Sequence, residues 1–168
     1  ISNVVVKGVR CPIWMSARGM YAPESPNAAI RNVHICNLTA TGVGKPSVAS
    51  LIQGSKERPI ENMLLSDITI LSVSEGTKDM VNNPVPEDVG DPNGLSNCSG
   101  IYIRYIKDLE MHNVRFGKLE NDERPVIICE KIDRLQMDNV RCLNDTGPQT
   151  VLLRDITVLK KKNTETVN

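Results

Sequence analysis

Apolar and polar residues alternate in a short pattern that recurs along the chain. The pattern reads apolar, any residue, Asn or Asp, apolar, any residue, apolar, as in Ile30-Arg-Asn-Val-His-Ile35 and Ile60-Glu-Asn-Met-Leu-Leu65. Alternation with a period of two residues is typical of strands that bury one face. The copies occupy residues 1–6, 30–35, 60–65, 106–111, 132–137 and 153–158, with the acid displaced by one place in the fifth. They predict an internal repeat built from strands.

A second polar residue follows four of the copies at a matching distance. These residues are Asn37, Asp67, Asn113 and Asn139, and Gly8 is assigned this place in the first copy. Asn and Asp tolerate the left-handed backbone conformation and bond to neighbouring backbone groups, which is typical of sharp bends. Each repeat is therefore predicted to form a strand, a corner and a second strand.

A further short apolar strand is predicted ahead of each later copy, in residues 12–15, 49–52, 100–103, 125–128 and 150–153. Copies start at residues 1, 30, 60, 106 and 132, so most intervals are 26 to 30 residues. Each repeat thus contains at least two strands and no helix, which predicts an all-β fold. The predicted architecture is a right-handed parallel β-helix of about five coils. The predicted parts are coils in 1–159, an insertion at 77–99 and a polar tail at 160–168.

Two other folds share part of this pattern. A leucine-rich repeat also combines Leu with a periodic Asn at a similar period. In this chain, however, Ile and Val carry the pattern, and the intervals contain a second strand. A β-sandwich is weaker still, because its hairpins would not regenerate one motif at a near-constant interval.

The two ends of the predicted stack differ in character. The chain begins inside a repeat, and a first coil at residues 1–6 would leave an exposed parallel edge. Because such edges favour aggregation, further coils of the same protein are expected upstream. The lysine-bearing tail at residues 160–168 suits the opposite end, since charged residues discourage further strand pairing.

Composition and charge argue against several classes of function. A chain of 168 residues that is 40% hydrophobic can fill one core. A net charge of zero without a basic stripe predicts no nucleic-acid partner, and no apolar run approaches the roughly 20 residues of a membrane helix. The five cysteines include no C-x-x-C pair and no His at zinc-finger spacing, so free buried thiols are expected, with no metal and no cofactor.

Several stretches, taken in their order along the chain, resemble one known family. They include Leu51-Ile-Gln-Gly54, Pro59-Ile-Glu-Asn-Met-Leu-Leu-Ser-Asp-Ile-Thr-Ile70 and Ser99-Gly-Ile-Tyr-Ile-Arg104. They resemble the late coils of glycoside hydrolase family 28, the polygalacturonase-like enzymes, over residues 1–158. The resemblance implies inverting hydrolysis of α-linked galacturonides in pectic polysaccharide, and an extracellular or periplasmic location. Inversion requires two carboxyl groups roughly 6.5–9.5 Å apart.

The family's catalytic motifs, Asn-Thr-Asp, Asp-Asp, Gly-His-Gly and Arg-Ile-Lys, do not occur in this chain. Asn144-Asp-Thr146 has the first motif's residues in another order, and Arg104-Tyr-Ile-Lys107 carries an additional Tyr. No catalytic residue is therefore assigned, and any activity is expected in coils preceding Ile1. The resemblance implies that this segment supports a glycosidase fold and extends its substrate groove.

Two other functions stay open at this point. A non-catalytic carbohydrate-binding or adhesin-like β-helix would use the same fold without hydrolysis. A polysaccharide lyase on the same fold would require an acidic calcium-binding cluster and a basic residue for β-elimination.

Aromatic and arginine side chains are the candidates for contact with a polysaccharide. Trp14, Arg18 and Tyr21 lie in one segment nearest the expected active site, and Tyr102 and Arg104 lie in a later coil. Aromatic rings offer a face for stacking on sugar rings, and a guanidinium can grip a uronate carboxylate bidentately. The competing interpretation makes Trp14 a core residue and Arg18 a solvated corner.

The remaining polar positions are predicted to be structural. Three aspartates stand where other copies carry Asn and are expected to join a ladder of corner side chains: Asp67, Asp108 and Asp155. His34 and His112 lie at outward strand positions, and no function is assigned to either. The acidic insertion at 77–99 would repel a polyuronate, so it is predicted to cover the side of the helix or to contact another domain.

Overall fold

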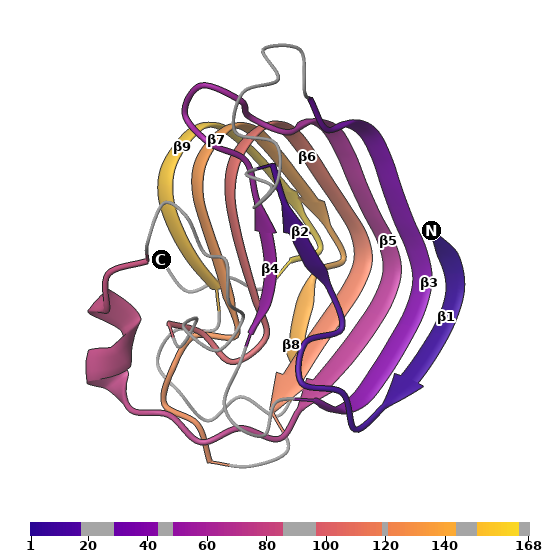
Figure 1. Cartoon of the computed structure of the whole chain (residues 1–168), viewed down its shortest axis with the longest axis vertical. Helices are drawn as coiled ribbons and strands as arrows, with labels where there is room; N and C mark the ends of the chain where they lie inside the picture. Colours follow the sequence, from indigo (N-terminus) through magenta and orange to yellow (C-terminus); the bar gives the residue numbers. More distant parts are fainter. Residues whose placement is uncertain (18–28, 44–48, 86–96, 119–120, 144–150, 165–168) are drawn as a thin grey trace.

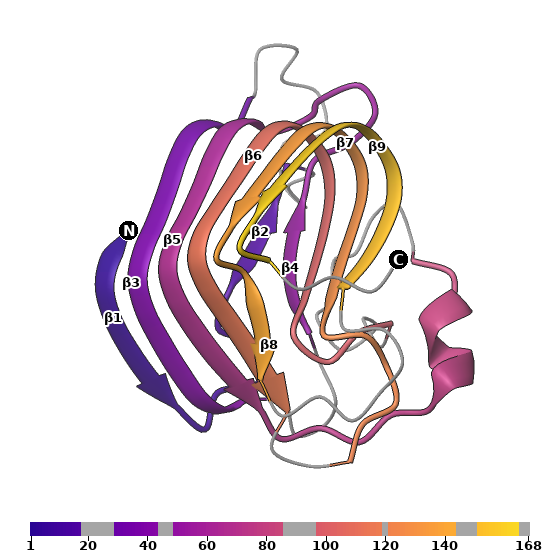
Figure 2. The same cartoon turned by 180° about the vertical axis from the view of Figure 1, so that it is seen from behind.

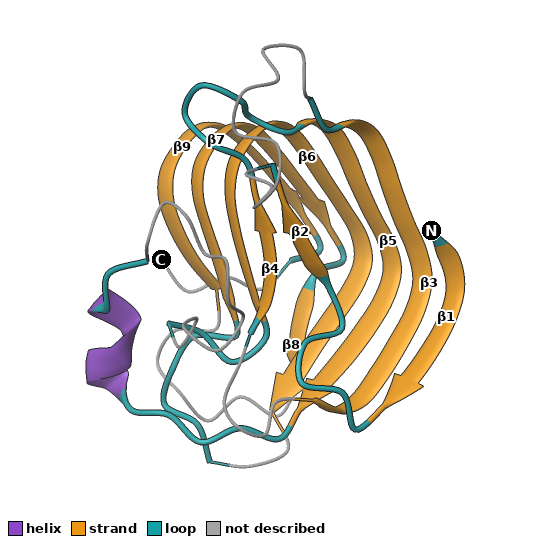
Figure 3. Ribbon diagram, viewed as in Figure 1, coloured by secondary structure: helices purple, strands orange, loops and turns teal. Residues whose placement is uncertain are grey.

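Strands make up most of the computed structural model, which describes residues 1–17, 29–43, 49–85, 97–118, 121–143 and 151–164 (Figure 3). The strands are β1 (Ser2–Lys7), β2 (Trp14–Ser16), β3 (Arg31–Val43), β4 (Ser50–Gln53), β5 (Glu61–Ser72), β6 (Ile101–Lys118), β7 (Ile127–Asp138), β8 (Arg141–Leu143) and β9 (Val151–Lys162). Among the described residues, the short 3-10 helix η1 (Lys78–Asn82) is the single helix. No described helix is long and apolar enough to cross a membrane.

The nine strands form one sheet in which every pairing is parallel. The long strands β1, β3, β5, β6, β7 and β9 lie side by side and curve in the same direction, with β2 and β4 across from them (Figures 1 and 2). Strand β6 joins the two sides, because its first residues pair with β4 and its later residues with β5. The fold is therefore all-β, with a curled, all-parallel sheet.

The predicted short strands form one wall of this sheet. We call it the short-strand wall: β2, β4 and the first residues of β6, β7 and β9. Its central residues are paired in one register in the column Trp14, Leu51, Tyr102, Ile128 and Leu152. The next residue along each strand belongs to the main core, as Ile52, Ile103 and Cys129 do. The predicted alignment of residues 12–15, 49–52, 100–103 and 150–153 is confirmed, whereas residues 125–128 are displaced by one place, because Ile128 and not Ile127 pairs with Tyr102 and Leu152.

The four middle copies of the repeat are also in the predicted register. Arg31 pairs with Glu61, and Ile60, Ile106 and Ile132 follow one another across the sheet. Inward residues of these copies fill the main core, in which Met63, Leu109 and Leu135 succeed one another on neighbouring strands.

The predicted alignment of the first copy is wrong. Asn3 lies beside Asn37 rather than Asn32, since the Asn37 side-chain amide donates to Asn3 Oδ1 over 2.6 Å. Gly8 accordingly lies beside Gly42, not beside Asn37. The cause is that the pattern occurs twice at β3, once around Asn32 and again around Asn37, so the pattern alone fits either alignment.

The last copy is also displaced. Ile156, not Leu153, pairs with Ile132, and Leu153 pairs with Cys129 in the short-strand wall. Strand β9 then continues to Lys162, so residues 160–162 of the predicted tail are part of the sheet.

Asn and Asp occupy the corners as predicted. Asn37, Asp67, Asn113 and Asn139 all have the left-handed backbone conformation, with φ between 52° and 55°. Asn113 donates to Asp67 Oδ1 over 3.1 Å, and Asn139 donates to Asn113 Oδ1 over 2.6 Å. We call these four residues, together with Asn3, the asparagine ladder.

Two of the three predicted ladder aspartates have other structural roles. Asp108 does not join the ladder but forms an ion pair with Arg134, its register partner, over 2.5 Å. Asp155 is left-handed, with φ of 51°, but it bends β9 directly before Ile156. The strand register explains both corrections. Asp108 lies opposite Arg134, and Asp155 lies at another bend of the sheet than the ladder residues.

All five cysteines are free, as predicted, but only two are fully buried: Cys98 and Cys129. The other three are half-buried. Burial raises the pKa of Cys98 to about 12, because the thiolate would lose its hydration. These two thiols are therefore packing groups.

Candidate functional site

A column of polar side chains crosses the short-strand wall, two residues beyond its central column. Its members are Ser16, Gln53, Arg104, Glu130 and Arg154. The Gln53 amide donates to Ser16 Oγ over 3.2 Å, and the Arg104 guanidinium donates twice to Gln53 Oε1, over 3.0 and 3.1 Å. An ion pair of 3.9 Å joins Arg154 to Glu130. Every strand of the wall thus contributes one polar group, and we call this row the polar column.

Aromatic side chains flank the polar column. Trp14 and Tyr102 belong to a small apolar cluster on this wall that is separate from the main core. The Arg104 guanidinium carbon lies 5.7 Å from the centre of the Tyr102 ring and 5.6 Å from that of Tyr105, within the range of cation–π attraction. Burial, then the hydrogen bond and charge of Glu130, raise the pKa of Tyr102, so its hydroxyl stays protonated.

Part of the predicted insertion covers the middle of this wall. Val81 and Val85 pack on the apolar cluster, and Arg104 donates to the Val85 carbonyl oxygen over 3.3 Å. Arg154 donates to Asn82 Oδ1 over 3.4 Å, and the Asn97 amide donates to the Val81 carbonyl oxygen over 3.1 Å. The described insertion residues therefore cover the side of the curled sheet, one of the two predicted roles.

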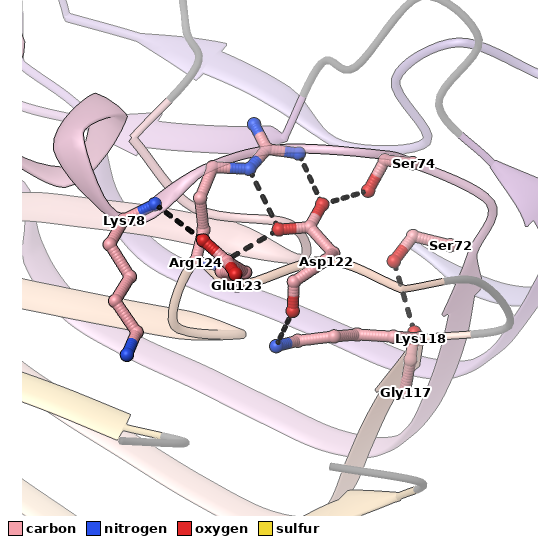
Figure 4. A network of polar contacts seen from close by, with 8 residues as sticks. All are labelled: Ser72, Ser74, Lys78, Gly117, Lys118, Asp122, Glu123 and Arg124. Atoms are coloured by element: carbon pink, nitrogen blue, oxygen red, sulfur yellow. Dashed lines mark hydrogen bonds and ion pairs between the residues drawn. The ribbon is translucent and has the colours of Figure 1, made fainter. Parts of the chain in front are cut away.

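A buried ion pair anchors the chain just before this cover (Figure 4). The side chains of Asp122 and Arg124 are fully buried and contact each other through Arg124 Nε (2.9 Å) and an NH2 group (2.5 Å). Ser74 donates to the same carboxylate over 2.8 Å, and Gly76 accepts a hydrogen bond from the Glu123 N–H over 2.8 Å. The turn at 121–124 thereby holds the segment that leads from β5 into the insertion.

The wall has binding groups but little of what hydrolysis needs. Inverting hydrolysis uses two carboxyl groups on opposite sides of the scissile bond, whereas Glu130 is the single carboxylate in the polar column. No group of three or more His, Cys, Asp or Glu residues in the described parts of the chain could hold a metal ion. The arrangement suits recognition of a polar ligand rather than catalysis on its own.

Three of the five predicted contact residues come together on this wall: Trp14, Tyr102 and Arg104. Trp14 is half-buried, whereas Tyr102 and Arg104 are only 2% and 3% exposed. A polysaccharide could reach these two only if the segment containing Val85 moved. Arg18 and Tyr21 lie outside the described residues. Their contact with a polysaccharide stays a prediction.

Sequence reasoning missed Ser16, Gln53, Glu130 and Arg154. Each lies two residues after the central apolar residue of a short strand that the sequence did predict. Reading this position across the predicted strands gives Ser16, Gln53, Arg104 and Arg154, but Glu130 is found only when residues 125–128 are shifted by one place. The two histidines have local partners, because His34 contacts Ser66 Oγ over 2.9 Å and His112 contacts Glu110 over 3.3 Å.

No protein-family model matches this chain, and neither the curated proteins nor the solved structures contain a match to it. The class of protein is therefore given by its architecture alone: an all-β protein with a curled, all-parallel sheet.

Proposed function

We propose that the curled sheet is part of a right-handed parallel β-helix that belongs to a glycoside hydrolase acting on pectic polysaccharide, outside the cell or in the periplasm. In this proposal the short-strand wall supports the fold and extends the groove that binds α-linked galacturonides. The observation that carries it is the polar column running beside Trp14 across successive strands.

The polar column has the spacing and chemistry that an extended acidic sugar chain requires. Neighbouring strands lie about 4.8 Å apart, so the polar groups of the column follow one another at about that interval. Arginine forks bind carboxylates bidentately, and Gln and Ser bond to hydroxyl groups. Trp14, Ser16 and Arg154 are half-buried, so the ends of the column are more accessible than Gln53 and Arg104.

The catalytic carboxylates would come from other coils of the same β-helix, since Glu130 has no carboxylate partner in the polar column. The order of sequence stretches that resemble late coils of glycoside hydrolase family 28 supports this arrangement. A non-catalytic carbohydrate-binding β-helix is the second candidate, and the same lone carboxylate favours it.

Titration with trigalacturonate, followed by the fluorescence of Trp14, tests the binding role. Trp14 is the only tryptophan in the chain and lies on the wall. We expect a saturable change with trigalacturonate and none with the neutral sugar maltotriose. Arg154→Ala should weaken binding about 10-fold, since it removes a charge-assisted contact, whereas Lys160→Ala, on the long-strand part of β9, should bind like the wild type.

Two results would contradict this proposal. Equal responses to the acidic and neutral sugars would show that the wall does not recognise a uronate. Release of reducing ends from polygalacturonate by this chain alone would show that its own residues, not those of other coils, carry hydrolysis.

A further inference from the structure

A second polar site lies on the outer side of the long strands, at the asparagine ladder. A groove of about 430 Å³ is lined there by His112, Asn113, Asp138, Asn139, Arg141 and Asn163. They lie in the later part of β6, at the end of β7 and just after it, in β8, and just after β9. None of them belongs to the polar column on the short-strand wall. The volume falls within the range of small-ligand sites, roughly 300–1,000 Å³.

Arg141, which lines this groove, has a second arginine as its register partner on the neighbouring strand. Arg115 of β6 pairs in register with Arg141 of β8, and both are exposed. Adjacent parallel strands are about 4.8 Å apart, so two like charges face outward at close range, an arrangement that destabilises a sheet when nothing neutralises it. Within the described residues, no carboxylate forms an ion pair with either arginine.

The acidic groups near the arginines already have other partners. Asp138 accepts a hydrogen bond from the Asn163 amide over 3.4 Å and forms an ion pair with Lys162 over 3.9 Å. Glu110 contacts His112 over 3.3 Å. Among the described residues, the positive charge of the two arginines is therefore not neutralised by an ion pair.

The ladder holds Arg141 in place and leaves further hydrogen-bonding capacity. Arg141 lines the groove and donates through Nε to Asn139 Oδ1 over 2.8 Å, which orients its guanidinium. Asn139 and Asn113 each use one amide N–H on the neighbouring strand. Each side chain amide has a second N–H, and Asp138 offers carboxylate oxygens to hydroxyl groups.

We propose that this groove binds a sugar that carries a carboxylate, a uronate. The paired guanidinium groups of Arg115 and Arg141 bind the carboxylate, because a planar fork matches carboxylate geometry. Asp138 and the ladder amides bind the hydroxyl groups. This inference rests on the groove and its arginines, and it stands whether or not the short-strand wall binds a polysaccharide.

NMR of the arginine Nε–H groups tests the site directly in the full chain. Titration with galacturonate should shift the Arg115 and Arg141 signals in a saturable way, whereas galactose should not. Acetate at matched ionic strength should act far more weakly, because it lacks the hydroxyl groups. Arg141→Lys keeps the charge but loses the fork, and it should weaken binding about 10-fold.

Matched variants separate this site from the short-strand wall. Arg115→Gln/Arg141→Gln should abolish the response of the remaining groove signals, with the backbone spectrum otherwise unchanged because both side chains are exposed. Arg154→Ala should leave the groove titration intact. The proposal is overturned if galactose or acetate shifts the arginine signals as strongly as galacturonate, or if the double variant still binds galacturonate at the groove.

Discussion

The buried ion pair between Asp122 and Arg124 allows the stability of this fold to be tested with one substitution, Asp122→Asn. Both side chains are fully buried, and the Asp122 carboxylate accepts hydrogen bonds from the Arg124 side chain, the Arg124 N–H and Ser74. The substitution keeps the shape of the side chain but removes its charge. Arg124 then stays buried beside a neutral amide in place of the Asp122 carboxylate.

The expected loss of unfolding free energy is about 3–5 kcal/mol, the usual effect of breaking a buried ion pair by removing one partner. At about 2–4 °C for each kcal/mol in a chain of this size, the melting temperature should fall by about 6–20 °C. Arg124→Met in the Asp122→Asn background also removes the buried positive charge. The double variant should therefore lose less than the sum of the two single losses.

The loss should also depend on pH in one direction. Burial alone would raise the pKa of Asp122, but the hydrogen bonds and charge of Arg124 hold it below its ordinary value of 3.8. A carboxyl whose pKa is lowered by folding stabilises the protein above the unfolded pKa and loses this contribution as pH falls through the folded pKa. The gap between wild type and Asp122→Asn should therefore be full at pH 7 and shrink below about pH 4.

Urea unfolding, followed by circular dichroism and Trp14 fluorescence, measures these differences. Asp67→Asn is the matched control, because Asp67 is an exposed ladder residue at a position where other strands carry Asn. It should change stability by less than about 0.5 kcal/mol. A loss below about 1 kcal/mol for Asp122→Asn, or equal losses for the two substitutions, would refute the assignment of the pair as a buried anchor.

Three further predictions concern other parts of the fold. Gly76→Ala should lower the free energy of unfolding in urea by about 1–3 kcal/mol, because the added Cβ would lie 2.0 Å from Arg124 Nε. An unchanged urea midpoint would mean that Arg124 can shift to make room for it. Asn113→Ala should lower the free energy of unfolding by about 1–3 kcal/mol, because it strains the backbone and removes two ladder hydrogen bonds. Asn113→Gly should cost less, since glycine tolerates the φ of 52°. Equal losses for the two variants would rule out backbone strain. Cys98 should resist a thiol reagent at pH 8, since a pKa of about 12 leaves only about 1 in 10,000 molecules as thiolate, and rapid labelling of the folded protein would contradict its burial.

The sequence alone predicted most strands and corners of this fold, because both depend on the preferences of neighbouring residues. The alternating residues around Val33 and Met63 specify strands because one face must be buried. Asn37 and Asn113 specify corners because their side chains favour the left-handed backbone that the bend requires. Comparison of the short apolar segments aligned Trp14, Leu51 and Tyr102 correctly, but it placed Ile127 where the structure has Ile128.

The tertiary structure alone decided the register at the two ends. The same pattern surrounds both Asn32 and Asn37, so Asn3 could be aligned with either until its hydrogen bond to Asn37 was seen. A shift of five residues superposes one copy of the pattern on the other, so only backbone pairing between strands distinguishes the two alignments.

The two candidate sites depended even more on the assembled structure. Arg104 and Tyr102 looked accessible in sequence, but residues around Val85, distant in the chain, cover them. Arg115 and Arg141 are likewise distant in sequence and become neighbours because β6 and β8 pair. Sequence determined which residues form strands and corners because those preferences are local, whereas burial and charge proximity arise only when successive strands stack.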